Sequence, residues 1–297
     1  MLSVTVDQIL VVGGGTMGRG VAQVAAQAGY ATTVVDVSEA AVARSLVAIR
    51  ASLDRAVARG HLPADAGKAA AERLSGTTDL EAAAAVADFV IENVPEDMAT
   101  KRGVFEVLGR RCRPGVVMAT NTSSLSITEI TAASGRPESA LGMHFFNPVP
   151  RMKLVELVRA LGTGDEAHET ARDVAARLGK DVVTVNEYPG LVTSRINAII
   201  GNEAFHMLQE GVASAEDIDK AIKLGLNHPM GPFEMADMVG LDVRLGVLRY
   251  LHATLGEKFR PAPLLVKYVQ AGRLGRKAGR GVYAYDAEGR RRDGADG

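Results

Sequence analysis

The sequence predicts an α/β domain built on a mostly parallel sheet with an inserted helical hairpin, followed by an all-helical domain. Short β-branched runs alternate with Ala-rich stretches of helical period from residue 1 to about 187, and this alternation favours parallel strands flanked by helices. After "NEYPG", residues 186 to 190, the β-branched runs stop. We therefore expect a first domain over 1–187, a second over 188–285, and a disordered tail over 286–297, which is charged and Gly-rich.

Seven runs in the first domain are predicted to be strands because they are short and rich in β-branched residues. They read "QILVVG", "ATTVVD", "ADFVIENV", "GVVMAT", "ESALGMHF", "MKLVELV" and "DVVTV". Between Ser38 and Leu74 this rhythm gives way to two helical stretches. Gly60 ends the first stretch and Pro63 lies in the first turn of the second, which predicts the inserted hairpin.

The second domain is predicted to hold four helices. They cover about 191–210, 214–224, 232–255 and 262–272. The segment "SRINAIIGNEAFHMLQ" is apolar around most of its circumference, so we expect it to pack against another helix or another subunit. A homodimer formed through this domain is the expected assembly.

Composition limits the classes of function. A chain of 297 residues with 47% hydrophobic residues can build two cores. Its 34 basic and 35 acidic residues leave a formal charge of −1, too little to attract nucleic acid or an anionic membrane. Cys112 is the only cysteine, the start has no signal-peptide pattern, and no apolar run approaches about 18 residues. We expect a cytoplasmic protein with no membrane or nucleic-acid partner and no metal site.

A glycine motif near the start predicts a dinucleotide site. Gly13, Gly15 and Gly18 follow a predicted strand and open a helix in G-x-G-x-x-G spacing, with Thr16 and Met17 inside the motif. These glycines allow a tight turn, a close pyrophosphate and close helix packing, and the helix N-terminus favours the anion. Asp36 ends the next β-run and can accept hydrogen bonds from a ribose 2'-hydroxyl, which favours NAD over NADP. Together with the glycine motif, this acid predicts a Rossmann-type domain.

A histidine and a glutamate form the candidate reaction centre. His144 opens "HFFNPVP", and Glu156 lies in "MKLVELV" on one strand face with Leu154 and Val158. A carboxylate with apolar companions needs a partner, and a histidine acts as a base near neutral pH when a second group fixes its tautomer. We therefore pair His144 with Glu156, although either residue alone is more typical of a structural role.

Six segments, taken together and in order, resemble the L-3-hydroxyacyl-CoA dehydrogenases, and the short-chain 3-hydroxybutyryl-CoA dehydrogenases are the nearest branch. They read "VVGGGTMGRGVAQ", "VIENVPEDMATKRGVF", "ATNTSSLSITEI", "GMHFFNPVPRMKLVELV", "GVASAEDIDKAIKLGLNHPMGPFEMADMVGLD" and "AGRLGRKAGRGVYAYD". The resemblance implies reversible, NAD-dependent oxidation of (S)-3-hydroxyacyl-CoA to 3-oxoacyl-CoA, as in β-oxidation, by a stand-alone enzyme. Substrates such as 3-hydroxybutyryl-CoA and acetoacetyl-CoA are implied.

The resemblance also implies residue roles. His144 would take the proton from the substrate 3-hydroxyl, Glu156 would orient it, and Ser123 would lie between nicotinamide and substrate and hydrogen-bond the reacting oxygen. Cofactor contacts are implied for Glu96, Lys101, Ser123, Asn147 and Lys277. On the inserted hairpin, Ser52 and Arg59 lie at the coenzyme A positions, and Arg55 shares a helix face with Arg59, although a basic helix face is more often simply solvated.

One position departs from the family pattern. The family's first helix in the second domain usually opens P-G-F-x-x-N-R, with the Asn in the active site, whereas this chain reads "PGLVTSRINAII". Ser194 therefore replaces an amide by a shorter hydroxyl. Asn197 lies one turn further on the same face and is a candidate substitute.

Alternative functions remain open from the sequence. The same chemistry on an acyl-carrier-protein-linked or free 3-hydroxy acid is one of them, and a catalytically weakened relative that only binds NAD or acyl-CoA is another. Lysine-dependent 3-hydroxy acid dehydrogenases need a lysine on the first helix of the second domain, and residues 191–211 contain none.

Overall fold

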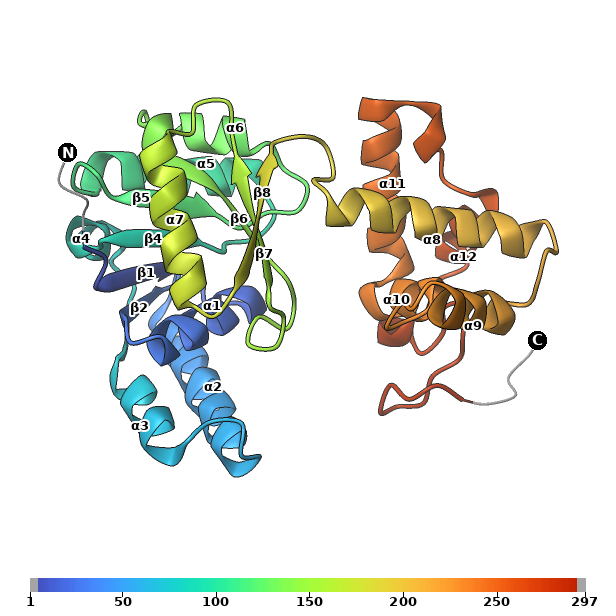
Figure 1. Cartoon of the computed structure of the whole chain (residues 1–297), viewed down its shortest axis with the longest axis horizontal. Coiled ribbons are helices and arrows are strands. Elements are labelled where there is room, and N and C mark those ends of the chain that lie inside the picture. Colours follow the sequence, from blue (N-terminus) through green and yellow to red (C-terminus); the bar gives the residue numbers. More distant parts are fainter. Residues whose placement is uncertain (1–4, 293–297) are drawn as a thin grey trace. The chain divides into compact units, whose positions relative to one another are not determined.

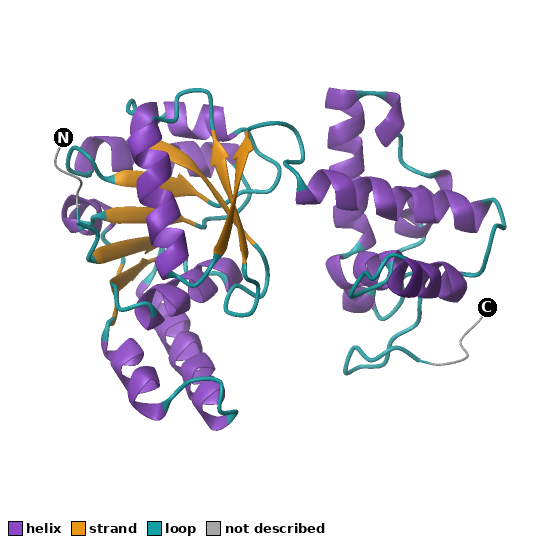
Figure 2. Cartoon of the chain, in the orientation of Figure 1, coloured by secondary structure: helices purple, strands orange, loops and turns teal. Residues whose placement is uncertain are grey.

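The computed structural model describes residues 5–292, and the chain divides into two compact units between Glu187 and Tyr188 (Figure 1). The first unit combines strands with helices, and the second is helical (Figure 2). The strands of the first unit are β1 (Gln8–Val12), β2 (Ala31–Val35), β3 (Leu74–Thr77), β4 (Phe89–Glu92), β5 (Val117–Thr120), β6 (Ala140–Phe145), β7 (Leu154–Arg159) and β8 (Asp181–Asn186). Its helices are α1 (Thr16–Gln27), α2 (Glu39–Ala58), α3 (Ala64–Glu72), α4 (Leu80–Val86), α5 (Met98–Arg111), α6 (Ile127–Ala132) and α7 (Asp165–Arg177), with a short 3-10 turn at Pro137–Ser139.

The strands form one sheet in the order β3-β2-β1-β4-β5-β6-β7-β8. All neighbours are parallel except β6 and β7, which run antiparallel. This confirms the predicted mostly parallel sheet. Strand β3 is absent from the seven predicted runs because "LSGT" has no β-branched run, and its register against β2 is what makes it a strand.

Alternate side chains of the strands face two different helical layers, as the strand pleat requires. Ile9 and Val11 of β1 pack with buried residues of α1, α2 and α7. Leu10 and Val12 pack on the other face with buried residues of α4, α5 and α6. Both faces are therefore covered, which explains the nearly continuous apolar strands.

The predicted helical hairpin is present, and α2 and α3 lie side by side, extending away from the sheet (Figure 1). Ser38 caps α2 by accepting a hydrogen bond from the amide of Ala41. Gly60 ends the first helix with a φ of 69°, and Pro63 is the N-cap of α3. The sequence signals for this insertion correspond closely to the observed turn.

The second unit has five α-helices among its described residues. They are α8 (Thr193–Gln209), α9 (Ala215–Gly225), α10 (Pro232–Val239), α11 (Leu241–Leu255) and α12 (Pro263–Gln270), with 3-10 turns at Glu257–Phe259 and Arg276–Ala278. The prediction of a single helix over 232–255 is wrong, because the helix is interrupted at Gly240. The backbone φ of Gly240 is 110°, which residues with a side chain rarely adopt, and a Cβ there would lie 2.8 Å from Oδ1 of Asp242.

Two buried carboxylates hold the last described segment of the second unit. Asp237 accepts hydrogen bonds from the amides of Val282 and Tyr283, both at 2.9 Å, and from the Tyr285 hydroxyl at 3.0 Å. Asp219 accepts one from the Tyr283 hydroxyl at 2.7 Å. Burial raises the pKa of both carboxyl groups, while these donors lower it. The segment is thus attached to α9 and α10 by buried polar contacts.

The prediction of a disordered tail from residue 286 is wrong for residues 286–292. Tyr285 and Arg291 form a backbone bridge, the Arg291 guanidinium lies 3.6 Å from the centre of the Tyr283 ring, and it pairs with Glu216 at 2.5 Å. The prediction rested on the low content of apolar residues, but this segment is held by the contacts of a cation, which composition does not indicate. Residues 293–297 lie outside the described residues.

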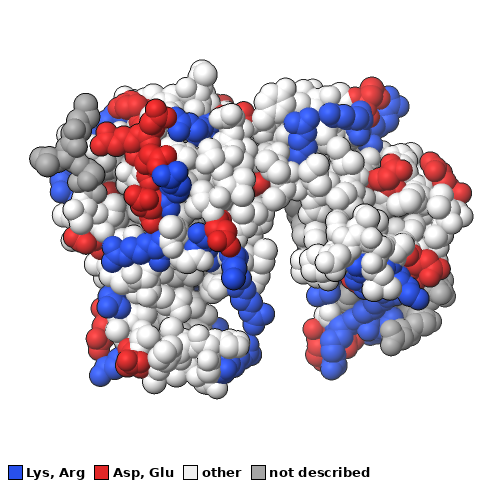
Figure 3. All heavy atoms as spheres, viewed as in Figure 1, with Lys and Arg blue, Asp and Glu red and all other residues white. Residues whose placement is uncertain are grey.

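The charged side chains on the face shown in Figure 3 are not segregated by sign, and basic and acidic groups are interspersed there. No helix among the described residues is long and apolar enough to cross a membrane.

We expect Asp237→Ala to lower the free energy of unfolding by about 3 kcal/mol or more, because a buried amide, a part-buried amide and a buried hydroxyl lose their acceptor. Urea unfolding measures the loss, and hydrogen exchange locates it at Val282 and Tyr283. Glu210→Ala is the control, since this exposed carboxylate at the end of α8 forms no side-chain hydrogen bond with described residues. Equal midpoints for the two variants would contradict the role of Asp237.

Candidate active site

The carboxyl ends of the parallel strands meet at one edge of the sheet, and the chain order reverses there between β1 and β4. Ligands of open α/β sheets bind in the crevice outside such a switch point. The strand exits are joined by backbone hydrogen bonds. The amide of Gly13 donates to Val35, that of Asn93 to Val12, and that of Asn121 to Glu92. The loops that follow these strands therefore start from a fixed edge.

The glycine motif lies at this edge with the geometry that a dinucleotide requires. Gly13 has a φ of 96°, and a Cβ there would lie 2.7 Å from the backbone of Asn93. A Cβ on Gly18 would lie 1.8 Å from the carbonyl oxygen of Gly13, whereas one on Gly15 would meet no atom within 4 Å. Gly13 and Gly18 are thus fixed by packing, and Gly15, the N-cap of α1, leaves space for a pyrophosphate.

Asp36 directly follows β2 at the same edge. Its Oδ2 accepts a hydrogen bond from the amide of Gly14 at 2.9 Å, and its Oδ1 accepts one from Val37 at 2.7 Å. The hydroxyl of Ser45 donates to the carbonyl of Gly14 at 2.8 Å. The carboxylate is held beside the glycine loop with lone pairs left for ribose hydroxyls, so these residues fit the adenosine half of NAD.

His144 and Glu156 are direct cross-strand partners. The antiparallel register of β6 and β7 pairs His144 with Glu156, and Nδ1 of the imidazole lies 2.7 Å from Oε2 of the carboxylate. The Glu156 side chain is 1% exposed, and the His144 side chain is 10% exposed. An ionised carboxylate only accepts, so Nδ1 carries the proton and Nε2 keeps its lone pair. The expected pair is therefore assembled with the tautomer that a base needs.

Ser123 lies in a loop that is held at three points. At its start, the Asn121 side chain accepts from the Phe145 amide at 3.1 Å. In its middle, Oε1 of Glu96 accepts from the hydroxyls of Thr122 at 2.5 Å and Ser124 at 2.9 Å, and from the Ser123 amide at 3.3 Å. The Ser123 residue itself is exposed, so its hydroxyl can face a ligand while the backbone is fixed.

The far end of this loop is held by Glu187, a residue that sequence reasoning missed. Its carboxylate accepts from the amides of Ile127 at 2.7 Å and Thr128 at 2.9 Å, at the start of α6. The Ser126 hydroxyl donates to it at 3.0 Å. In the sequence Glu187 is only an acid after a strand, and nothing there indicates a partner some sixty residues earlier.

Lys101 differs from its expected role as a cofactor contact. Its side chain is 0% exposed, and Nζ donates to both carboxylate oxygens of Glu92, at 2.8 and 3.0 Å, and to the carbonyl of Asn121 at 3.0 Å. Burial raises the pKa of Glu92, and the Lys101 ammonium, the Thr120 hydroxyl and the Val94 amide oppose this shift. The lysine therefore joins α5 to the exits of β4 and β5 from inside the protein, because it has acceptors there for its ammonium.

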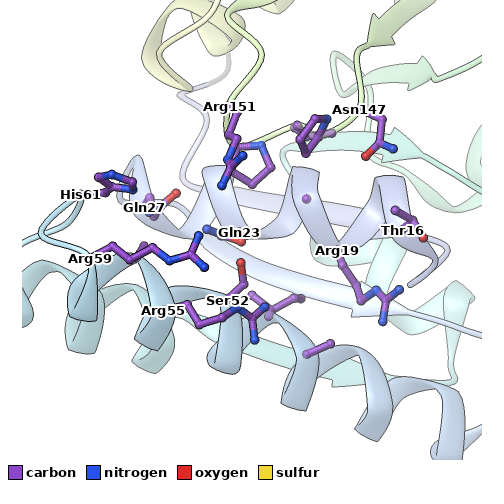
Figure 4. Close-up of a pocket in the computed structure, with 17 residues that line it drawn as sticks. Thr16, Arg19, Gln23, Gln27, Ser52, Arg55, Arg59, His61, Asn147 and Arg151 are labelled. Atoms are coloured by element: carbon purple, nitrogen blue, oxygen red, sulfur yellow. The ribbon is translucent and has the colours of Figure 1, made fainter. Parts of the chain in front are cut away.

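A pocket of about 570 Å³ lies between α1, α2 and the loop after β6 (Figure 4). The three residues expected to grip coenzyme A, Ser52, Arg55 and Arg59, line it from α2, and Thr16 and Asn147 line it too. The structure thus brings the expected carrier residues and two expected cofactor residues to one cavity. Arg19 and Arg151 also line this pocket, and sequence reasoning did not single them out.

The remaining candidates lie in the second unit. Ser194 is half-buried on α8, and Lys277 pairs with Asp242, with Nζ 2.8 Å from Oδ2. The Asn197 amide lies 3.2 and 3.0 Å from the terminal nitrogens of the half-buried Arg244, so its oxygen faces this guanidinium, which only donates. Burial lowers the pKa of Arg244 to about 10. Asn197 is thus engaged within its own unit, and its proposed substitution for the missing amide stays a prediction.

A glycine loop, a carboxylate beside it and a histidine paired with a buried carboxylate lie at one sheet edge, an arrangement typical of nicotinamide-dependent dehydrogenases. The chain belongs to the 3-hydroxyacyl-CoA dehydrogenase family. Residues 8–188 match the family's NAD-binding domain, and residues 190–285 match its C-terminal domain. Both domains support NAD-dependent oxidation of 3-hydroxyacyl-CoA thioesters by this chain.

Similar proteins cover the chain almost completely. A probable 3-hydroxybutyryl-CoA dehydrogenase of Bacillus subtilis is 46% identical over 95% of this chain and 98% of its own length. A 3-hydroxybutyryl-CoA dehydrogenase of Bradyrhizobium diazoefficiens is 42% identical over 96% of this chain and 97% of its own. The crystal structure of (S)-3-hydroxybutyryl-CoA dehydrogenase from Ralstonia eutropha has a TM-score of 0.92 and 42% identity, and the match covers 95% of this chain and all of that one.

We expect Lys101→Met to lower the stability of the first unit by about 3 to 5 kcal/mol, because Glu92 then remains buried without a counter-charge. Denaturant unfolding measures the change. Lys68→Met is the matched control, since Lys68 is exposed on α3. Adding Glu92→Gln to Lys101→Met should recover part of the loss, and a single variant as stable as the control would contradict the structural role.

Proposed function

We propose that the protein oxidises short-chain (S)-3-hydroxyacyl-CoA thioesters, with 3-hydroxybutyryl-CoA as substrate and acetoacetyl-CoA as product. The observation that carries this proposal is the His144 and Glu156 pair, at 2.7 Å, on β6 and β7 of the sheet whose β1 leads into the glycine loop. The short acyl chain is supported by the names of relatives at 46% and 42% identity.

His144 acts as the base in this proposal. Nε2 accepts the proton of the substrate 3-hydroxyl, and the charge that develops on the imidazole is stabilised by Glu156 through Nδ1. A bound NAD would supply the acceptor for the hydride that leaves C3. The buried position of Glu156 strengthens this stabilisation, because little water screens the carboxylate. Ser123 offers an exposed hydroxyl to the reacting oxygen.

The cofactor contacts predicted from the sequence are part of this proposal. Gly13, Gly15, Thr16, Met17 and Gly18 would hold the pyrophosphate, and Asp36 the ribose, as the glycine geometry supports. Glu96, which accepts a hydrogen bond from the amide of Ser123, is proposed to contact the cofactor beside this loop. Asn147 is proposed to contact it from the edge of the pocket. Lys277, whose ammonium donates a hydrogen bond to Asp242, is also proposed to contact the cofactor.

Coenzyme A is the proposed carrier of the acyl group, and Ser52, Arg55 and Arg59 are its proposed ligands. The pocket that they line supports this choice over a free hydroxy acid, which would leave these cations without a partner. The proposed assembly is a cytoplasmic homodimer through the second unit, supported by the exposed apolar residues Val192, Ile196 and Ile199 at and near the start of α8.

We expect His144→Gln to lower kcat for oxidation of 3-hydroxybutyryl-CoA by about three orders of magnitude or more, because the general base is lost. Glu156→Gln keeps a similar shape but removes the charge, and we expect a loss of about two to four orders of magnitude. NADH absorbance measures both rates. His252→Gln, a change of a histidine on α11 that lies outside this pair and does not line the pocket, is the comparison, and a His144 variant with the same kcat as this control would refute the assignment.

We expect Ser194→Asn to raise kcat/KM for acetoacetyl-CoA by about one to three orders of magnitude if the family amide acts mainly in the transition state. Asn197→Ala tests the proposed substitute at the same helix, and we expect it to lower kcat/KM. If both variants equal the wild type in NADH consumption, this helix does not contribute to the reaction as supposed.

A further inference from the structure

The pocket beside the candidate active site has two basic walls, of which only one was expected. Arg55 and Arg59 line it from α2, and Arg19 from α1 and Arg151 from the loop after β6 line the opposite side. Figure 4 shows Arg151 reaching from its loop toward Gln23 on α1, and Arg59 reaching from α2 toward the same space. His61, beyond the end of α2, borders the cavity as well.

The charge of this cavity is entirely of one sign among the described residues. Four arginines line it, and none of its lining residues is an Asp or Glu. None of the four guanidinium groups forms an ion pair with a described residue, although the whole chain has a formal charge of only −1. Four unpaired cations on facing walls favour a ligand with several phosphate groups, since each guanidinium can bind phosphate oxygens in pairs.

The loop that presents Arg151 is held from behind by a buried lysine. Lys180 is 8% exposed, and its Nζ donates to the carbonyl of Val149 at 2.6 Å and to that of Met152 at 2.9 Å. The amides of Arg151 and Met152 both donate to the carbonyl of Pro148. The backbone on both sides of Arg151 is thus fixed, so its exposed side chain projects from a fixed position.

Arg19 is positioned by the helix that begins the dinucleotide loop. Its Nε donates to the carbonyl of Gly15 at 3.3 Å, while its terminal nitrogens have no partner among the described residues. Gly20 next to it lets the Arg151 loop approach, because a Cβ there would lie 2.8 Å from Cβ of Val149. The two cations of the second wall therefore come from elements in direct contact.

We propose that Arg151 and Arg19 determine carrier specificity by binding phosphate groups of coenzyme A from the wall opposite the hairpin. The inference rests on the proposed function and adds these two residues to it. The 3'-phosphate and diphosphate of coenzyme A carry about four negative charges, which match the four arginines. The arm of an acyl carrier protein has one phosphodiester, and a free hydroxy acid has none, so neither ligand neutralises both walls.

The test compares Arg151→Gln, Arg19→Gln and the control Arg50→Gln. Arg50 is exposed on α2 and does not line the pocket. Steady-state rates are measured with acetoacetyl-CoA, its 3'-dephospho form and acetoacetyl-pantetheine, which lacks phosphates. We expect Arg151→Gln to raise KM for acetoacetyl-CoA about ten- to a hundred-fold, as for a lost charge-assisted contact, and by a clearly smaller factor for acetoacetyl-pantetheine. Arg19→Gln should act in the same direction.

Two results would overturn the inference. One is an Arg151 variant whose KM for acetoacetyl-CoA matches that of the Arg50 control. The other is an equal rise of KM for acetoacetyl-CoA and acetoacetyl-pantetheine, which would place the effect on the acyl end. Arg151→Lys keeps the charge but loses the planar fork, and we expect a KM between those of the wild type and Arg151→Gln.

Calorimetry with coenzyme A separates this inference from the proposed function. If the wild type binds coenzyme A, Arg151→Gln weakens that binding at least ten-fold, and the wild type does not reduce acetoacetyl-CoA, the proposed function fails and the second wall stands. If the wild type reduces acetoacetyl-CoA and Arg151→Gln changes neither KM nor binding, the second wall fails and the proposed function stands.

Discussion

The arrangement of the loops at the sheet edge depends on the buried contacts of the Lys101 ammonium with Glu92 and Asn121. The ammonium enters from α5 and meets the carboxylate that ends β4 and the carbonyl that follows β5. A buried pair of this kind is costly to break because either charge alone remains desolvated. From Asn121 the order continues, since its amide group donates to Asn93 and accepts from the Phe145 amide, next to His144. The dinucleotide side and the histidine side of the edge are therefore one hydrogen-bonded unit.

The single antiparallel pair of the sheet supplies what parallel strands do not. Parallel neighbours deliver the loops after β1, β4 and β5 to one edge, but a histidine also needs a partner fixed across from it. Because β7 returns antiparallel to β6, Glu156 lies opposite His144 in register, and the pairing needs no loop. A shift of β7 by one residue would turn Glu156 to the other face of the sheet and leave His144 without this partner. The register and the catalytic tautomer thus have the same origin.

The sequence predicts well those features that depend on neighbouring residues. Gly13, Asp36 and the hairpin boundaries follow from local turn and cap chemistry, and His144 could be paired with Glu156 because both lie near each other along the chain. Long-range partners could not be predicted in this way. Lys180 and Glu187 look like solvated residues in the sequence, and the burial that gives them partners appears only when distant segments meet. Lys101 also has partners that the sequence did not predict. The family resemblance implied a cofactor contact for this lysine, whereas in the fold its ammonium donates to Glu92 and Asn121.

The connection from β6 to β7 relates the chemistry to the recognition of the carrier. It begins beside His144, carries Asn147 and Arg151, and ends before the strand of Glu156. Lys180 fixes it through two backbone carbonyls, which require no particular side chain at the positions that they occupy. Residue 151 is thus free to vary without moving the catalytic pair, because its backbone is held independently of its side chain. An arginine at such a position adds a phosphate contact while the geometry of the base stays unchanged.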